Sequence, residues 1–228
     1  MIRTPMVLIA LLAALVFAGC GDDDSDSDKS SAGGADTAAA KSEGECADVQ
    51  APKAKPDGGA TKPKAELDPA KTHTVELQTS CGDFTVTLDV EGAPNTAASF
   101  ASLARSGFYD DTVFHRIVPG FVIQGGDPTG TGTGGPGYKT VDKPPANASY
   151  TRGVVSMAKT GAEAPGTSGS QFYVVTGADA GLPPEYAIVG EVTAGMDAVM
   201  RIEALGDPSG SEQPSRPVVI EKATVSES

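Results

Sequence analysis

Three side chains of different chemistry lie close together in residues 114–128. Arg116 could donate hydrogen bonds, Phe121 could cover an apolar group, and the amide of Gln124 could both donate and accept. The surrounding sequence is strand-like and is interrupted by a turn at Pro119–Gly120. Taken alone, this composition indicates a buried pair of strands in which Arg116 is a charge that needs a partner.

Other motifs that could carry chemistry are weak. Gly132–Gly137 formally matches G-x-G-x-x-G, but no helix opens after it, and Tyr138 interrupts what would otherwise be a phosphate loop. Gly166–Ser170 is not the strand-turn-helix elbow of a nucleophilic serine, and only His73 and His115 could act as its base. Two His and three Cys residues are scattered without metal-ligand spacing, so we expect no metal and no cofactor.

The stretch from Phe114 to Pro128, FHRIVPGFVIQGGDP, resembles the signature of the cyclophilin-type peptidyl-prolyl cis-trans isomerases. Gly132–Gly135 resembles the Gly-Thr-Gly-Gly loop of that family, and residues 156–158 and 169–173 resemble the segments that line its proline pocket. The resemblance covers most of residues 71–226. It implies an enzyme that interconverts cis and trans X–Pro bonds in proline-containing segments of client proteins.

The resemblance also implies roles for individual residues. Rotation about an X–Pro bond must break amide resonance against a barrier of ~18–20 kcal/mol, so the site should bind the twisted amide better than either planar form. Arg116 would donate hydrogen bonds to the prolyl nitrogen or carbonyl, Gln124 would position Arg116 or the substrate, and Phe121 would complete the catalytic set. The substrate-binding residues implied are Val122, Gly132, Ala158, Gln171, Tyr173, Leu182 and Tyr186.

The sequence departs from the family pattern around this pocket. Five residues differ from those that the family often has: Val122 stands in place of Met, Lys159 in place of Asn, Tyr173 in place of Phe, Gly181 in place of Trp, and Tyr186 in place of His. Two other functions stay open: a chaperone module that holds proline-containing segments without turnover, and a structural envelope protein in which the domain is only an interaction surface. The presence of Arg116 favours the isomerase.

The elements that must position these residues are short and mostly extended. Residues 73–79 and 84–88 alternate apolar and polar residues across a Gly/Asp turn, which predicts a hairpin. Helical spacing predicts helices over 94–106 and 194–205. Further strands are predicted at 113–118, 121–124, 154–157, 172–175, 187–192 and 218–225. Many short strands with two helices indicate a mainly β fold, and the resemblance implies an eight-stranded closed antiparallel β-barrel capped by two α-helices.

The N-terminus is typical of a bacterial lipoprotein signal. Arg3 precedes an apolar run over residues 6–19 that is too short to span a bilayer and ends at Cys20, which predicts a signal peptide over 1–19 and acylation of Cys20. An ordinary signal peptide and an uncleaved anchor are the alternatives. The expected location is the bacterial cell envelope, outside the cytoplasm, with a lipid anchor as the contact with the membrane.

Residues 20–70 are acidic, rich in Gly, Ala and Pro, and contain no aromatic residue. Such a segment has too little apolar area to build a core, so we predict a disordered tether over 20–70 and an isomerase domain over 71–226. The whole chain has a formal net charge of −13, which argues against nucleic acid as a partner. We expect a monomer.

Two cysteines remain if Cys20 is acylated. In an oxidising compartment Cys46 and Cys81 could form a disulfide that pins part of the tether to the domain. The alternative is a pair of free thiols.

Overall fold

The computed structural model describes residues 44–228. The signal peptide predicted over 1–19, Cys20, and residues 20–43 of the predicted tether lie outside the described residues. Within the described part of the chain, neither helix is long and apolar enough to cross a bilayer.

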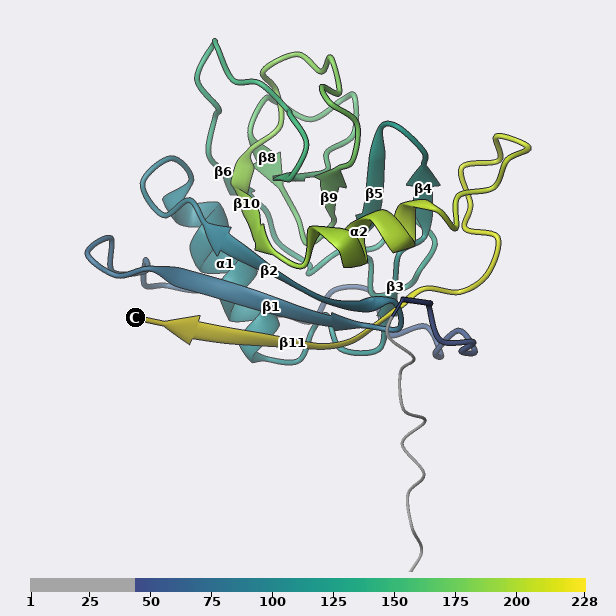
Figure 1. The fold of residues 1–228 in the computed structure, drawn as a ribbon. Coiled ribbons are helices and arrows are strands. Elements are labelled where there is room, and N and C mark those ends of the chain that lie inside the picture. Colours follow the sequence, from purple (N-terminus) through teal and green to yellow (C-terminus); the bar gives the residue numbers. More distant parts are fainter. Residues whose placement is uncertain (1–43) are drawn as a thin grey trace, which may run out of the picture. The chain divides into compact units, whose positions relative to one another are not determined.

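A curled, nine-stranded antiparallel sheet forms the body of the domain (Figure 1). Its order is β3-β11-β1-β2-β10-β7-β9-β5-β4, and β6 and β8 form a separate two-stranded sheet. The strands are β1 (His73–Thr79), β2 (Gly82–Leu88), β3 (Thr112–Val113), β4 (Arg116–Val118), β5 (Val122–Gly125), β6 (Thr140–Val141), β7 (Val154–Met157), β8 (Thr167–Ser168), β9 (Phe172–Val175), β10 (Ile188–Ala194) and β11 (Val219–Glu227).

The predicted closed barrel of eight strands is corrected to this open sheet of nine. The reason lies between β3 and β4, where the single strand predicted over 113–118 is broken at Phe114 and His115. The Phe114 N–H donates to Val218 O, whereas the His115 N–H donates to Gln124 O, so the chain changes partner from one edge of the sheet to the other. The two edge strands are therefore consecutive in sequence but are not paired with each other.

Two helices pack on the sheet, as predicted. Helix α1 (Pro94–Arg105) contacts β6, β10 and β11, and α2 (Met196–Glu203) contacts β2, β4 and β5 (Figure 1). Helix α2 is shorter than the 194–205 predicted, because β10 continues to Ala194 and Gly195 takes a left-handed conformation. A Cβ at Gly195 would lie 2.2 Å from Asp83 O, so only glycine permits this close approach.

Aromatic rings fill the core beneath the sheet. Phe100 on α1 lies 5.0 Å from Tyr109 and 5.3 Å from Phe172, centroid to centroid. Phe114 packs edge-on against Phe172 at 6.1 Å. All four rings are fully buried. Phe172 belongs to β9, which passes under the candidate site, so the core fixes the floor of that site.

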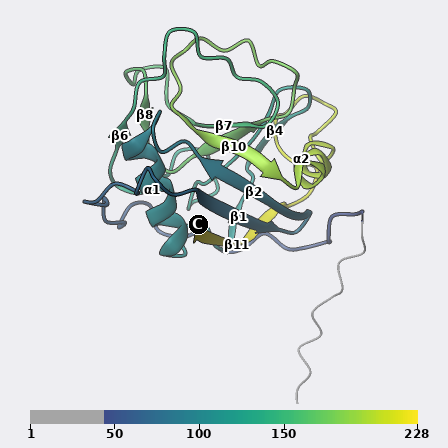
Figure 2. The same ribbon diagram turned by 60° about the vertical axis from the view of Figure 1, so that its left-hand side comes forward.

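The prediction of a tether extending to residue 70 is wrong for residues 44–67, which form an N-terminal strap along the domain. The strap has no aromatic residue and no core of its own, but Cys46, Ala60 and Leu67 pack against the core of the domain. Lys55 donates backbone and side-chain hydrogen bonds to the domain, the latter to Gly107 O, Phe108 O and Asp110 O. Figure 2 shows part of the strap, in dark blue, beside α1.

A disulfide holds the start of the strap. Cys46 is bonded to Cys81, which lies in the turn between β1 and β2, and the Ala47 N–H donates to Ser80 O at 2.7 Å. The pairing that the sequence left as one of two alternatives is therefore present in the structure.

We expect the double variant Cys46→Ser/Cys81→Ser to unfold with a free energy lower by ~3–4 kcal/mol, because the bridge restricts a loop of about 35 residues in the unfolded chain. Urea denaturation of the oxidised wild type and the variant measures the difference. A reductant should destabilise the wild type and leave the variant unchanged. Two free thiols in the unreduced, denatured wild type would contradict the bridge.

Candidate active site

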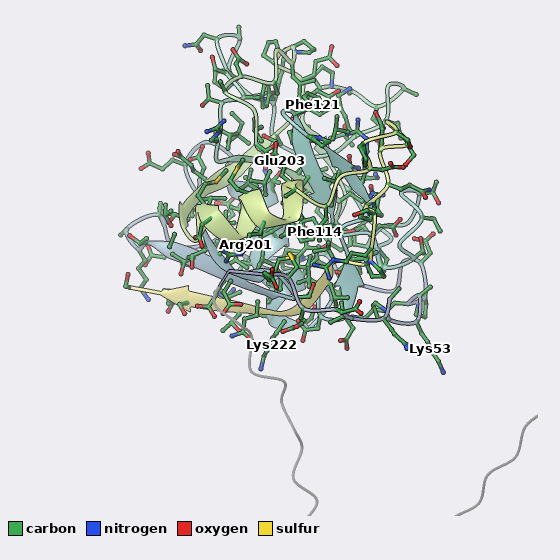
Figure 3. The ribbon with its side chains drawn as sticks, turned by 45° about the vertical axis from the view of Figure 1, so that its right-hand side comes forward. Lys53, Phe114, Phe121, Arg201, Glu203 and Lys222 are labelled. Atoms are coloured by element: carbon green, nitrogen blue, oxygen red, sulfur yellow. A yellow bond between two sulfur atoms is a disulfide. The ribbon has the colours of Figure 1, made fainter. Side chains whose placement is uncertain are left out.

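An open hollow of about 260 Å³ lies beside Arg116. We call it the Arg116 hollow. Six of its nine lining residues are apolar or aromatic; among them, Val122 and Tyr173 belong to a second buried cluster against which Phe121 and Leu182 pack. Figure 3 shows Phe121 above the end of α2, where the Glu203 carboxylate accepts a hydrogen bond from the Gly120 N–H at 2.6 Å. The full lining is Arg116, Phe121, Val122, Gln124, Ala158, Lys159, Tyr173, Leu182 and Tyr186.

Strand register brings the polar members of this hollow together. Arg116 on β4 is the cross-strand partner of Gln124 on β5, and Gln124 is in turn the partner of Tyr173 on β9. Side chains of directly paired residues lie on the same face of a sheet. The turn at Pro119–Gly120 therefore places residues eight positions apart in sequence next to each other.

A chain of hydrogen bonds runs from the Arg116 hollow along the face of the sheet. Arg116 Nη1 donates to Gln124 Oε1 at 3.4 Å, and Gln124 Nε2 donates to Gln171 Oε1 at 3.1 Å. Gln171 Nε2 then donates to Gly134 O at 2.9 Å, and the Gly134 N–H donates to the Asp127 carboxylate at 3.1 Å. Each amide thus both accepts and donates, which fixes its orientation.

A second hollow of about 240 Å³ adjoins the first and shares Gln124, Ala158 and Lys159 with it. We call it the Gly132 hollow. It is more polar: Lys139 and Glu163 form an ion pair of 2.8 Å at its edge. Gly132 and Gln171, predicted to bind substrate, lie here and not in the Arg116 hollow. All the predicted catalytic and substrate-binding residues line one hollow or the other.

The Asp127 side chain shapes the glycine loop at the Gly132 hollow. Burial opposes its ionisation, but its carboxylate accepts hydrogen bonds from the backbone N–H groups of Thr129, Gly132 and Gly134, and the net result is a pKa below its ordinary value. The charged form therefore holds the loop in place.

The pKa of His115, the neighbour of Arg116 in sequence, is shifted away from neutrality. Burial lowers the pKa of His115, and the positive charge of Arg116 adds to that effect although Asp127 opposes it. Both ring nitrogens of His115 are buried without a hydrogen-bond partner in the described structure. These features favour a neutral, structural imidazole.

Two charged residues at or near the Arg116 hollow were not predicted from the sequence as part of the site. Lys159 was noted only as a departure from the family pattern, yet its side chain is 3% exposed, pairs with Glu185 at 3.0 Å and lies over the Tyr186 ring. Glu212 carried no signal in the sequence. Its carboxylate accepts from Arg116 Nε at 2.8 Å and from Nη2 at 3.3 Å, and this contact lowers the pKa of Glu212.

The Arg116 hollow thus places a guanidinium beside apolar and aromatic side chains on the face of a curled sheet. Comparison with known proteins identifies the family to which the chain belongs. The family model described as "Cyclophilin type peptidyl-prolyl cis-trans isomerase/CLD" matches residues 74–225. The chain belongs to this family and is a peptidyl-prolyl cis-trans isomerase.

Relatives and solved structures support the same assignment. The peptidyl-prolyl cis-trans isomerase A of Mycobacterium tuberculosis is 40% identical over 178 residues, which cover 69% of this chain and 94% of that protein. An isomerase of Schizosaccharomyces pombe is 41% identical over 153 residues, or 65% of this chain and 96% of its own length. The crystal structure of a cyclophilin-type isomerase from Cryptosporidium parvum has a TM-score of 0.62 at 34% identity and covers 68% of this chain and 98% of that one.

We expect Asp127→Asn to lower the free energy of unfolding at pH 7 by about 2–3 kcal/mol, because an amide cannot accept all the hydrogen bonds that the buried carboxylate receives. Since the pKa of Asp127 is lower in the folded protein, its stabilisation is complete above the ordinary pKa near 3.8 and disappears as the pH falls through the lowered value. The difference between wild type and variant should therefore be constant near neutrality and narrow below about pH 4.

Urea unfolding of both proteins between pH 3 and pH 8 measures this difference. Asp48→Asn, at an exposed position of the strap, is the matched control and should unfold like the wild type. An Asp127→Asn protein as stable as the wild type at pH 7 would show that the carboxylate does not hold the loop.

Proposed function

We propose that the protein accelerates X–Pro isomerisation during the folding of proteins outside the cytoplasmic membrane, with Arg116 as the catalytic donor and the Arg116 hollow as the site of the proline ring. The observation that carries the proposal is the position of the Arg116 guanidinium. It lies 5.7 Å from the centre of the Phe121 ring and donates a hydrogen bond to Gln124. A cation that is fixed beside an apolar wall is suited to an amide whose proline ring is apolar and whose nitrogen is becoming basic.

The mechanism needs no proton transfer. As the X–Pro bond twists, the nitrogen lone pair leaves conjugation and becomes a hydrogen-bond acceptor. A guanidinium N–H aimed at that nitrogen or at the prolyl carbonyl binds the twisted state more tightly than the planar ones, which lowers the barrier. Phe121, Val122, Tyr173 and Leu182 would hold the ring, and Tyr186 would close the rim.

The residues that flank the proline would lie toward the Gly132 hollow. The Gln171 side chain and the Ala158 carbonyl offer a donor and acceptors there, whereas the Ala158 N–H already donates to Gln171 O at 2.9 Å. A solved Cryptosporidium parvum relative, 33% identical over 67% of this chain, was crystallised in the presence of the dipeptide Ala-Pro. A short Ala-Pro peptide is therefore the substrate of choice for the first assay.

The extracytoplasmic role rests on two features. The apolar run that ends at Cys20 is typical of a lipoprotein signal, and the Cys46–Cys81 disulfide is of a kind that persists in oxidising compartments. Client proteins that fold there would carry the proline-containing segments on which the domain acts.

Arg116→Ala should lower kcat and kcat/KM together by on the order of a hundred- to a thousandfold, because the lost hydrogen bond exists mainly in the transition state. Phe121→Ala should also weaken peptide binding, because it removes apolar surface that is used in every state. The measurement is a protease-coupled assay with an Ala-Pro peptide, with the fold of each variant checked by circular dichroism. A folded Arg116→Ala protein within about twofold of the wild-type rate would make the catalytic assignment wrong. Wild type that binds the peptide without turnover would favour the chaperone module.

The lipid anchor is tested by cell fractionation. Full-length protein produced in a bacterial host should sediment with membranes, because a diacylated N-terminal cysteine is held in the bilayer by its acyl chains. Cys20→Ser should appear in the soluble fraction or remain unprocessed. Equal membrane association of the processed forms of both proteins would rule out the anchor.

A further inference from the structure

A short loop between α2 and β11, residues 206–215, reaches the outer edge of the candidate site. The start of the loop is held by Gly206, which packs closely against β4 and the turn that follows it. A Cβ added at Gly206 would lie only 2.6 Å from Pro119 Cγ. At the far end of the loop the Ile117 N–H, on β4, donates to Glu212 O at 2.8 Å. The loop therefore follows the free edge of β4.

The backbone of this loop aims the Glu212 side chain at Arg116. Glu212 has a φ of +61°, a left-handed conformation that costs free energy for a residue with a Cβ. The loop is closed internally, because the Asp207 carboxylate accepts from the hydroxyls of Ser209 and Ser211, and the Asp207 N–H donates to Gln213 O. A conformation of this kind persists only where surrounding contacts enforce it.

The contact between Glu212 and Arg116 is side-on. One carboxylate oxygen accepts from Nε at 2.8 Å and the other from Nη2 at 3.3 Å, while Nη1 donates to Gln124. A guanidinium has five N–H bonds, so these contacts of the described residues leave one N–H on Nη1 and one on Nη2. Those two belong to the end of the guanidinium, where a substrate can meet them.

We propose that Glu212 is a positioning residue for the isomerase reaction: it holds the guanidinium of Arg116 from the side and leaves its end free to donate to the twisting amide. This inference rests on the proposed catalytic role of Arg116. The Arg116 side chain is 30% exposed, so without a fixed partner on its outer side its long, flexible stem would sample several rotamers. Gln124 restrains it from one side only, and through a longer hydrogen bond.

Two partners on different edges determine the plane of a guanidinium, whereas one leaves it free to turn. Glu212 and Gln124 contact different edges of Arg116. Glu212 also lies outside the apolar wall of the Arg116 hollow, so its removal leaves the surface that would hold the proline ring intact. The proposal therefore predicts a loss in kcat with little change in KM.

Glu212→Gln in the full-length protein should lower kcat about tenfold, because misplacing a donor by a fraction of an ångström weakens the transition state more than the bound ground state. KM for the Ala-Pro peptide should stay within about twofold of the wild-type value. Glu212→Ala provides a second variant, in which the loss should be at least as large. Glu76→Gln, an exposed carboxylate on β1, is the matched charge control and should leave both constants unchanged.

A double-mutant cycle separates positioning from a general structural effect. In an Arg116→Lys background the Glu212→Gln substitution should change kcat by less than about twofold, because an ammonium has no plane to orient. A full tenfold loss in that background would overturn the proposal, as would a folded Glu212→Gln protein with wild-type kcat. A faster Glu212→Gln enzyme would also overturn it, since the carboxylate would then compete with the substrate. If Arg116→Ala is itself as active as wild type, the proposed function fails first, and the inference fails with it.

Discussion

The proposed role of Arg116 depends on one constraint: a guanidinium must stay charged and oriented beside an apolar wall while some of its N–H groups remain available. A half-buried cation is costly unless it has partners, and a cation with all donors engaged cannot catalyse. The structure meets both demands by pairing Arg116 across strands with Gln124 and by supporting that amide through Gln171. The break between β3 and β4 at residues 114–115 makes this pairing possible, because it turns β4 away from β11 and against β5.

The Gln124 and Gln171 side-chain amides are also supported by residues outside the Arg116 hollow. Gln171 is held by the glycine loop, whose shape depends on the charged Asp127 carboxylate, and the strap binds the outside of the same region. The Gly58 N–H donates to Gly135 O and the Gly135 N–H donates to the Asp57 carboxylate. The disulfide fixes the strap at its other end. A segment whose composition predicts a spacer thus supports Gly135, one of the residues that line the Gly132 hollow.

Much of the fold and the hollow could be predicted from the sequence because local signals agree there with the tertiary structure. Alternation predicted β1 and β2, and helical spacing predicted both helices. The family resemblance predicted which residues gather at the two hollows. The strap could not be predicted from composition, since its order comes from the core of another part of the chain. Glu212 could not be predicted either. It is 96 positions from Arg116, and its place depends on a left-handed backbone and on the close packing of Gly206.

The pKa shifts around Arg116 suit the proposed mechanism. An isomerase that transfers no proton gains nothing from a group that titrates near neutrality, and a change of charge beside Arg116 would disturb the donor. Burial lowers the pKa of His115, Arg116 lowers that of Glu212, and burial raises that of Tyr173. Each shift moves the group away from neutral pH, so the imidazole and the phenol stay uncharged and the carboxylate stays ionised. Around Arg116 the shifted groups thus keep one charge state across the neutral range, so a guanidinium that donates to the substrate, as proposed, would do so in a constant field.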